Sequence, residues 1–365
     1  AFWEWTIPVV TYLRSLPQQS DHPNGRGTLT VEYNPGARTA AKTAKPQHYQ
    51  NIIAFEIAKH GLTLHILPSG AQETIPNTPA AVRRILCREE RRNTRGSLGA
   101  MLIVCEATGG YERHVLGAAV ALCIPLHRAH GVRTRYFARY LGLAKTDPID
   151  ARMLAAYGRD TPDLRLYTQP PPQESALRAL RGRRDEIKAM MRMEANRLEH
   201  AHHPRVAVSI KAHLRAMDKE LRQIEAAITS LLQASPDMAR QPRLMQSLKG
   251  VGPATATACL AYLPELGTFT KGQVARITGL APIANDSGKA SMPRHIAGGR
   301  AIMRQSLYMA AVVAIQYNTN IAAYAAGLKK RGKPAKLVIT AVMRKIIIIL
   351  NAIVRDGTPA RSQNT

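Results

Sequence analysis

The sequence is poor in aromatic residues and in cysteine. Aromatic side chains make up 5% of its 365 residues, so base stacking should not dominate any contact with nucleic acid. The four cysteines form no CxxC pair, which argues against a zinc site and against a disulfide framework. We therefore expect buried thiols in a reducing compartment, at Cys87, Cys105, Cys123 and Cys259.

Long apolar runs are also missing. No run of about 18 apolar residues occurs, so we expect no segment that spans a membrane. The most apolar stretch, residues 345–354, is shorter than that and predicts a buried helix. Residues 1–10 lack the basic start and the cleavage site of a secretory signal peptide.

Acids are few, and positive charge is in excess. The chain has 51 Lys and Arg against 25 Asp and Glu, a formal net charge of +26. This balance indicates a polyanionic partner, most simply nucleic acid, with an anionic membrane surface as the weaker alternative. Phosphate contacts by Lys and Arg should then supply most of the affinity.

The patterning of the first half predicts an α/β fold. Residues 1–50, rich in Pro, Gly and polar residues, predict a disordered extension. Residues 51–165 contain short apolar runs with helical segments between and after them, which predicts an α/β domain. The strands are expected at residues 51–57, 62–67, 100–106 and 123–129.

Residues 166–238 predict a coiled coil. After a Pro-rich break at residues 167–175, apolar residues recur at alternating spacings of four and three. We expect an antiparallel helical hairpin, or coils that pair between protomers. Residues 200–205 would be its turn, where a polar tip is favoured over a metal site made of His200, His202 and His203. The heptad positions are Ile210, Leu214, Met217, Leu221, Ile224, Ile228 and Leu231.

Residues 239–357 predict a mostly helical domain, followed by a tail at 358–365. Within it, "GVGPATA" fits the turn of a helix-hairpin-helix. Gly250 and Gly252 would allow a tight turn, and backbone N–H groups of the next helix would hold a DNA phosphate. The alternative is an ordinary glycine-rich turn between two core helices.

Four acids stand at positions that suit a metal site. Glu56 and Glu106 lie at the ends of expected strands, and Asp147 and Asp150 share one side of an expected helix. Carboxylate oxygens suit Mg²⁺ or Mn²⁺. The alternative is that these acids only mark strand ends and a helix start.

A polar loop carries Ser287, next to Gly288. A loop serine by itself is usually a turn residue, and no base lies beside it in the sequence, although His295 is near. The cations around the loop would suit a bound phosphate. They are Lys289, Arg294, Arg300 and Arg304.

These motifs, in this order, resemble those of transposases of the insertion sequence 110 family, the DEDD class related to the Piv DNA invertase. The resemblance covers about residues 51–357. It rests on "FEIAK", "EATGGY", "KTDPIDA", "GVGPATA", "GLAP" followed by "SG", and "GGRAIMRQSLYMAAVVA".

The resemblance implies a RuvC-like, ribonuclease-H-type domain whose four acids bind Mg²⁺ or Mn²⁺, and a transposase domain with a serine nucleophile. The acids would be Glu56, Glu106, Asp147 and Asp150, and the nucleophile Ser287. The family further implies double-stranded DNA and a structured guide RNA as partners, and a dimer or tetramer. We also expect Lys145 among the nucleic-acid contacts, and a bacterial, nucleoid-associated location.

One position departs from the family. Its first acid is aspartate, and here it is Glu56, whose extra methylene displaces the carboxylate by about 1.5 Å. The sequence thus predicts a recombinase that exchanges DNA strands through a serine phosphodiester. The alternatives are a metal-dependent junction nuclease that uses the acids alone, and a nucleic-acid-binding protein with weakened catalysis.

Overall fold

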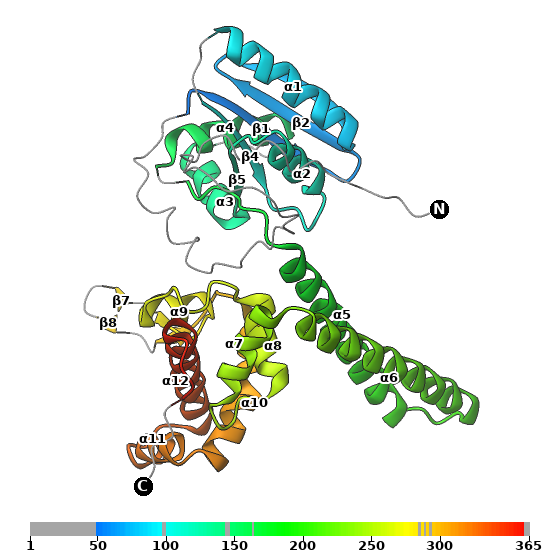
Figure 1. Ribbon diagram of the computed structural model, residues 1–365, viewed down its shortest axis with the longest axis vertical. Helices are drawn as coiled ribbons and strands as arrows, with labels where there is room; N and C mark the ends of the chain where they lie inside the picture. The colour runs from blue at the N-terminus through cyan, green and yellow to red at the C-terminus, as the bar shows by residue number, and fades with distance from the viewer. Residues whose placement is uncertain are drawn as a thin grey trace, which may run out of the picture. The chain divides into compact units, whose positions relative to one another are not determined.

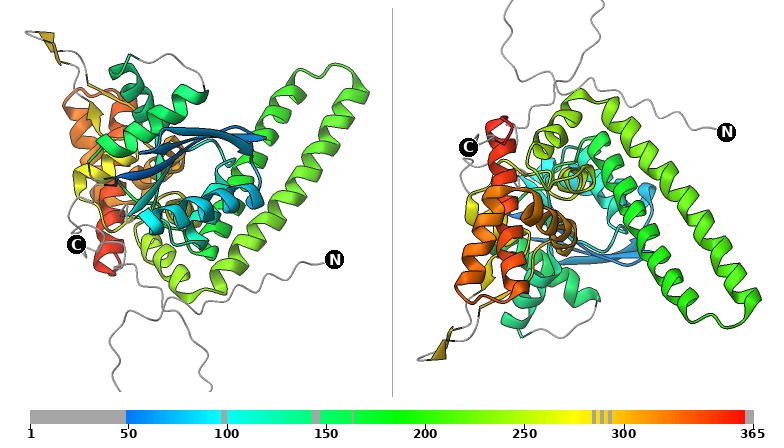
Figure 2. Two further views of the ribbon diagram at one scale, coloured as in Figure 1. Left: turned by 90° about the horizontal axis from the view of Figure 1, so that it is seen from above. Right: turned by 90° about the horizontal axis from the view of Figure 1, so that it is seen from below.

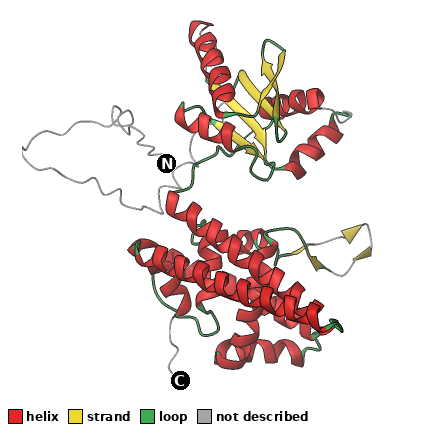
Figure 3. Ribbon diagram, turned by 90° about the vertical axis from the view of Figure 1, so that its right-hand side faces the viewer, coloured by secondary structure: helices red, strands yellow, loops and turns green. Residues whose placement is uncertain are grey.

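The computed structural model describes most of the chain from residue 49 on. The described residues are 49–96, 100–142, 147–162, 164–283, 286–287, 290–291 and 294–360. Nearly all of the extension expected over residues 1–50 lies outside them, as do Lys145 and Lys289. A mixed α/β part with a five-stranded sheet precedes a mostly helical part (Figure 3), which confirms the predicted fold class at this level.

One sheet organises the α/β part, in the order β3-β2-β1-β4-β5 (Figure 1). β1, β2 and β3 pair antiparallel, whereas β4 and β5 run parallel to β1. The strands are Asn51–Ile57 (β1), Gly61–Leu67 (β2), Ala71–Pro76 (β3), Met101–Glu106 (β4) and Leu126–Ala129 (β5).

Two strands differ from the prediction. β3 was missed because its sequence, AQETIP, has a single buried side chain, Ile75, and so carries no apolar run. β5 begins three residues later than expected. Cys123 has a φ of 54°, a left-handed conformation that no strand residue adopts, and Pro125 follows it.

Helices cover both faces of the sheet, so the central strand β1 is buried on both sides. Ile53 and Phe55 face α1 (Pro79–Gly96) and α2 (Arg113–Ala121). Ile52 and Ala54 face the opposite side, where α3 and α4 pack. α3 spans Gly131–Tyr140 and α4 spans Asp147–Asp160.

A long helical hairpin follows, made of α5 (Pro172–Glu199) and α6 (Pro204–Gln233). The two helices run side by side along their length (Figure 2), which agrees with the antiparallel form of the predicted coiled coil. The heptad seam meets α5 through Met217, Leu221 and Ile187. At the turn, Nδ1 of His203 accepts a hydrogen bond from the backbone N–H of Arg205 at 3.3 Å, so this histidine is a helix cap.

The helical part after the hairpin is held by one apolar core to which every one of its helices contributes. Buried Asn351 pins the loop before α9 to this core: its side-chain oxygen accepts from Gly267 N at 2.9 Å, and its nitrogen donates to Phe269 O at 2.8 Å. The helices are α7 (Pro236–Gln246), α8 (Pro253–Tyr262), α9 (Lys271–Ile277), α10 (Ala301–Tyr317), α11 (Thr319–Lys330) and α12 (Ala335–Asp356).

Among the described residues, one helix is long and apolar enough to cross a membrane. It is the last helix, α12. The sequence analysis predicted a buried helix at residues 345–354, and the helix is longer than that, Ala335–Asp356. Its inner side chains are nevertheless buried in the core with α10, as Val342, Ile346 and Leu350 show. A core helix passes the same test of length and hydropathy, so no membrane protein is indicated.

Candidate functional site

The sheet register brings two of the predicted acids to one place. β1 and β4 are parallel and pair Phe55 with Cys105, so the next residues along both strands, Glu56 and Glu106, lie side by side. Neighbouring strands are about 4.8 Å apart. Both acids have even numbers in strands whose even residues face α4, so both point to that side of the sheet.

Helix α4 packs on this face of the sheet, where its residues Leu154 and Tyr157 are buried with Ile52 of β1. A Cβ on Gly158, near the end of α4, would lie 2.6 Å from Val104 of β4 and 3.5 Å from Ile52 of β1. This end of the helix therefore lies directly over both strands.

Asp147 opens α4, one helical turn before Ala151, which is fully buried against the sheet. Asp150 stands in the same way one turn before buried Leu154. The predicted pair therefore lies in the first turn of a helix, and Asp150 is on its sheet-facing side. The side chain of Asp147 is outside the described atoms.

Glu106 also contacts the start of α3. A Cβ on Gly131, the first residue of that helix, would clash with Oε1 of Glu106. Gly131 thus leaves the space that the carboxylate occupies, and a larger residue would displace it. Sequence reasoning did not single out this glycine, which follows the strand end of β5 by only two residues.

The loop after Glu106, the "ATGGY" segment, is held by a buried acid that the sequence prediction missed. Oε2 of Glu112 accepts hydrogen bonds from Gly110 N at 2.8 Å, from the Thr108 hydroxyl at 3.0 Å and from Thr108 N at 3.3 Å. Oε1 lies 3.6 Å from Arg128. Burial alone would raise the pKa of Glu112, but the hydrogen bonds it receives outweigh burial and leave the pKa lowered.

Asn77 ties three segments together at this edge of the sheet. Its side-chain nitrogen donates to Ala58 O at 3.0 Å, after β1, and to Tyr111 O at 3.1 Å, in the loop after β4. Its own position is between β3 and α1. The edge that carries Glu56 and Glu106 is therefore cross-linked by side chains, a role that no sequence pattern marked.

Two buried histidines lie on the face of the sheet that α4 covers. They are level with the residues two positions before Glu56 and Glu106, the two acids called here the acidic edge. His65 is opposite Ala54, and His127 is opposite Val104. Burial is the main reason that the pKa of each is lowered, so both are neutral at pH 7. Nδ1 of His127 donates to Arg165 O at 2.8 Å, which holds the segment after α4 against β5.

The donor set at the edge consists of carboxylates. Within the described residues, no group of three or more His, Cys, Asp or Glu side chains is close enough to hold a metal ion. The sheet register sets Glu56 beside Glu106, and carboxylate oxygens of this kind suit Mg²⁺ or Mn²⁺ rather than zinc.

Ser287 lies on a thin β-arm. β6 (Pro282–Ile283) pairs with β9 (His295–Ile296), and further out β7 (Asp286–Ser287) pairs with β8 (Ala290–Ser291). Figure 3 shows this arm projecting from the helical part. Ser287 is opposite Ala290, so it stands at the outer end of the arm; its side chain is outside the described atoms.

The base of the arm is closed by glycines. A Cβ on Gly299 would lie 2.7 Å from both Gly279 Cα and Ile277 O, and both glycines have positive φ angles, 64° and 67°. Arg300 N donates to Ile277 O at 2.7 Å across the same junction. The two ends of the arm therefore approach too closely for any side chain.

Two cations expected to meet a phosphate are occupied otherwise. The guanidinium of Arg300 makes a bidentate pair with Glu265, at 2.8 and 2.9 Å, and bonds Tyr262 O at 2.7 Å. Arg304 donates to Gly298 O at 2.5 Å and to Thr278 O at 3.5 Å, so it bridges the base of the arm. These donors stabilise the fold, and a phosphate contact by either arginine stays a prediction. Arg294 is exposed beside β9.

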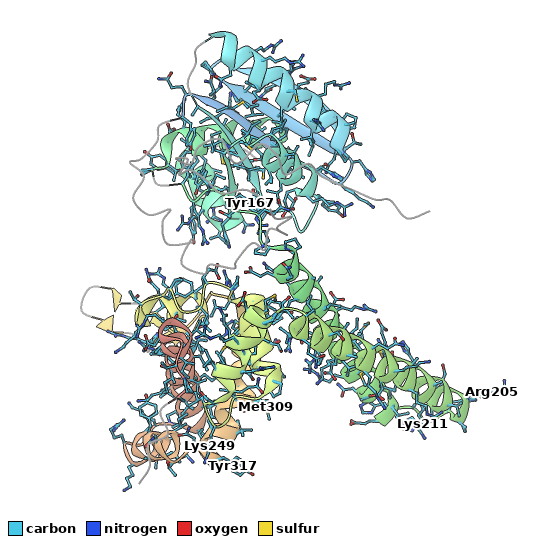
Figure 4. The ribbon with its side chains drawn as sticks, viewed as in Figure 1. Tyr167, Arg205, Lys211, Lys249, Met309 and Tyr317 are labelled. Atoms are coloured by element: carbon cyan, nitrogen blue, oxygen red, sulfur yellow. The ribbon has the colours of Figure 1, made fainter. Side chains whose placement is uncertain are left out.

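The glycine-rich hairpin between α7 and α8 is only partly as predicted. Gly250 has a φ of 106°, and a Cβ there would lie 2.5 Å from that of Ala314, so glycine is required. Gly252 has an ordinary φ of −87° and open space around it, so the turn does not require glycine there. Figure 4 shows Lys249 beside this hairpin, where Gly252 and Lys249 are exposed.

Comparisons with known proteins agree with this geometry. Two family models match: a DEDD-type transposase model over residues 54–201, and one described as transposase IS116/IS110/IS902 family over residues 242–326. Together they span well over half of the chain.

Three relatives are similar in sequence. The pilin gene-inverting proteins of Moraxella lacunata and Moraxella bovis are each 26% identical over 268 residues, which cover 70% of this chain and 81% of the relative. An uncharacterized 43.6 kDa protein of insertion element IS110 from Streptomyces coelicolor is 28% identical over 155 residues, 42% of this chain and 37% of the relative.

Proposed function

This chain belongs to the IS116/IS110/IS902 family of transposases and is a DNA transposase or recombinase. On that premise we propose that it cuts and rejoins DNA strands through a phosphodiester on Ser287, assisted by the acidic edge of the sheet. The observation that carries the proposal is the register that sets Glu56 beside Glu106. Asp147 and Asp150, in the first turn of α4, would complete the site.

The acidic edge is the proposed binding site for Mg²⁺, or Mn²⁺. A divalent ion there would neutralise charge on a phosphodiester. Glu56, Glu106, Asp147 and Asp150 would hold it, and Gly131 keeps the space for Glu106. The sheet order, with three antiparallel strands followed by two parallel ones, supports a RuvC-like, ribonuclease-H-type domain.

The strand exchange proceeds on Ser287. Its Oγ loses its proton and forms a bond to phosphorus, while the bond from phosphorus to one deoxyribose oxygen breaks, and that oxygen leaves as a hydroxyl. A hydroxyl of the second strand then attacks the same phosphorus and releases Ser287. The phosphodiester energy is conserved in the link, so rejoining needs no nucleotide cofactor.

The nucleic-acid contacts follow from the same proposal. Arg294 and Lys289 on the arm would neutralise the phosphate beside Ser287, and Lys145 the one near the acids. The exposed start of α8 after Gly252 offers backbone N–H groups to a further phosphate of double-stranded DNA.

Two further partners belong to the proposal. A structured guide RNA fits the positive charge that remains beyond DNA contacts. A dimer or tetramer would bring separate arms and acidic edges to the two DNA strands. The protomers would be joined by the outer half of the α5–α6 hairpin, where Met193 and Val208 are exposed.

Trapping the covalent link tests the proposal. We expect the full chain, with supercoiled element-end DNA, Mg²⁺ and cognate RNA, to yield a protein–DNA adduct on a denaturing gel. Ser287→Ala should abolish it. Ser291→Ala, which changes a serine of the adjoining arm strand, is the matched control and should retain it. An adduct that survives Ser287→Ala contradicts the assignment.

The alternatives give other outcomes. A junction nuclease that uses the acids alone would cut DNA without an adduct and would lose cutting in the double variant Asp147→Asn, Asp150→Asn. A binding protein with weakened catalysis would retain DNA without adduct or cutting. Glu56, where the family pattern has aspartate, is the feature that favours this last outcome.

A further inference from the structure

The turn between α11 and α12 concentrates positive charge that none of the functions above uses. Between residues 266 and 355 the chain has one acid, Asp286, and none lies near this turn in the sequence. Five cations fall within eight residues that end α11, form the turn and start α12. They are Lys329, Lys330, Arg331, Lys333 and Lys336, called here the basic turn.

The basic turn has a fixed backbone. Arg331 N and Lys333 N both donate to Leu328 O, at 3.2 Å, and Gly332 N donates to Lys329 O at 2.9 Å. Gly332 supplies the positive φ, 70°, that the turn needs. Its two helices pack on one another, and α12 is part of the core. The cations are therefore presented from a rigid support, and all five are exposed.

These cations differ from those of the α5–α6 hairpin. On the hairpin, Arg183 pairs with Glu220, Arg197 with Glu194 and Arg222 with Asp218. Among the residues that the structure describes, no ion pair joins a cation of the basic turn to an acid. These three hairpin arginines are paired within the fold, whereas the cations of the basic turn are not paired with any described acid.

Fold stability does not account for all of this charge. Lys329 and Lys330 end α11, where cations interact favourably with the helix dipole. Lys333 and Lys336 lie at the start of α12, where the dipole is positive and cations are disfavoured. A bound anion would reverse that unfavourable interaction, since helix starts and lysines both attract phosphate.

The basic turn is also distant from the arm that carries Ser287. α12 has 22 residues and is about 33 Å long. Its far end packs against the loop before α9, where Gly267 meets Val354, and the arm begins just after α9. Figure 1 shows α11 at the end of α12 opposite to α9. The family match also ends at residue 326, before the basic turn.

We propose that the basic turn binds the sugar–phosphate backbone of double-stranded DNA, outside the segment that is cut. Residues 327–337 contain no aromatic side chain for stacking on unpaired bases, and four of the five cations are lysines, which meet phosphates as point charges. We therefore expect the contact to be to phosphates of a duplex. The proposal does not depend on the chemistry of Ser287 or of the acids.

The test is the salt dependence of DNA binding by the full chain carrying Lys330→Gln, Lys333→Gln and Lys336→Gln. Loss of three phosphate contacts should reduce the slope of log K against log salt by about 2.7 and weaken binding of a random-sequence duplex roughly 100-fold at 0.15 M salt. The thermal midpoint should not fall, because two of the lysines oppose the dipole of α12. Replacing the same residues with arginine should restore binding.

The matched control removes the same charge from the hairpin, by Arg183→Gln, Arg197→Gln and Arg222→Gln, and should change affinity less than about threefold because those arginines are paired in the fold. An unchanged slope in the basic-turn variant, or an equal loss in the control, overturns the proposal. So does a loss confined to duplex RNA or to vesicles of anionic lipid, measured in parallel.

In the unmodified protein, duplex DNA should protect the four lysines of the basic turn from an amine-reactive label while Lys211, exposed on the hairpin, stays reactive (Figure 4). Equal labelling of all five lysines with and without DNA contradicts the proposal, and this measurement involves no substitution that could alter folding.

Discussion

The acidic edge and the serine arm present the two halves of the proposed chemistry on very different supports. Glu106 is the last residue of β4, and Glu56 is the last but one of β1. Both strands are buried on both faces, and α4 packs on one of these faces. Ser287 stands on two-residue strands at the outer end of an arm. The glutamates are therefore held by packing along a whole sheet, whereas the arm that carries Ser287 is held only where it joins the helical part.

Both supports nevertheless depend on glycines at close approaches. Gly131 leaves room for the carboxylate of Glu106, and Gly299 leaves room for the backbone of Gly279. The neighbouring atoms differ: a side-chain oxygen can move aside, and a backbone cannot. The same substitution, glycine to alanine, should therefore damage function at the first position and both fold and function at the second.

The largest expected effect is at the base of the arm. Gly299→Ala should destabilise the protein by about 3 kcal/mol, because a left-handed φ disfavours alanine and the new Cβ meets backbone atoms. Recombination should be lost with it. Gly298→Ala has nearly the same φ, 66°, but open space, and should cost only about 1 kcal/mol. Urea denaturation distinguishes them; equal losses would contradict the close approach.

The next effect separates activity from stability. Gly131→Ala should leave the unfolding midpoint almost unchanged, because only the end of the Glu106 side chain must move. The displaced carboxylate should lower the recombination rate about 100-fold. Gly117→Ala, on α2 with open space around it, is the control and should not alter the rate. Full activity in Gly131→Ala would show that Glu106 is not needed where it lies.

The sequence predicted the acidic edge better than the arm, for a physical reason. Apolar runs mark buried strands, so the positions of Glu56 and Glu106 near strand ends were predictable from the pattern. That the two strands are parallel neighbours, which sets the acids side by side, came from the structure. The heptads predicted the α5–α6 hairpin in the same way. The half-exposed strand β3 carries no such pattern and was missed.

Partners of charged groups were not predictable from the sequence. Arg300 and Arg304 looked like phosphate ligands because they surround a serine loop, yet one pairs with Glu265, 35 residues away, and the other with backbone carbonyls. Glu112 and Asn77 likewise act through contacts between segments. Such contacts join segments that turns bring together in space. Hydrophobic periodicity predicts helices and strands but not which loops become neighbours.

The smallest expected effect concerns the loop that follows Glu106. Glu112→Gln keeps an acceptor for Thr108 and Gly110 but removes the charge, and should cost about 1 kcal/mol at pH 7. Because the pKa of Glu112 is lowered in the fold, this stabilisation is present above the unfolded pKa of about 4.3 and is lost as pH falls through the folded value. The difference in unfolding free energy between the wild type and Glu112→Gln should therefore shrink as pH falls below about 4.3 and disappear once pH is below the folded pKa of Glu112. Glu186→Gln, on the exposed hairpin, should show little difference at either pH. A gap between the wild type and Glu112→Gln that persists at low pH would mean that packing of the side chain, rather than its charge, holds the loop.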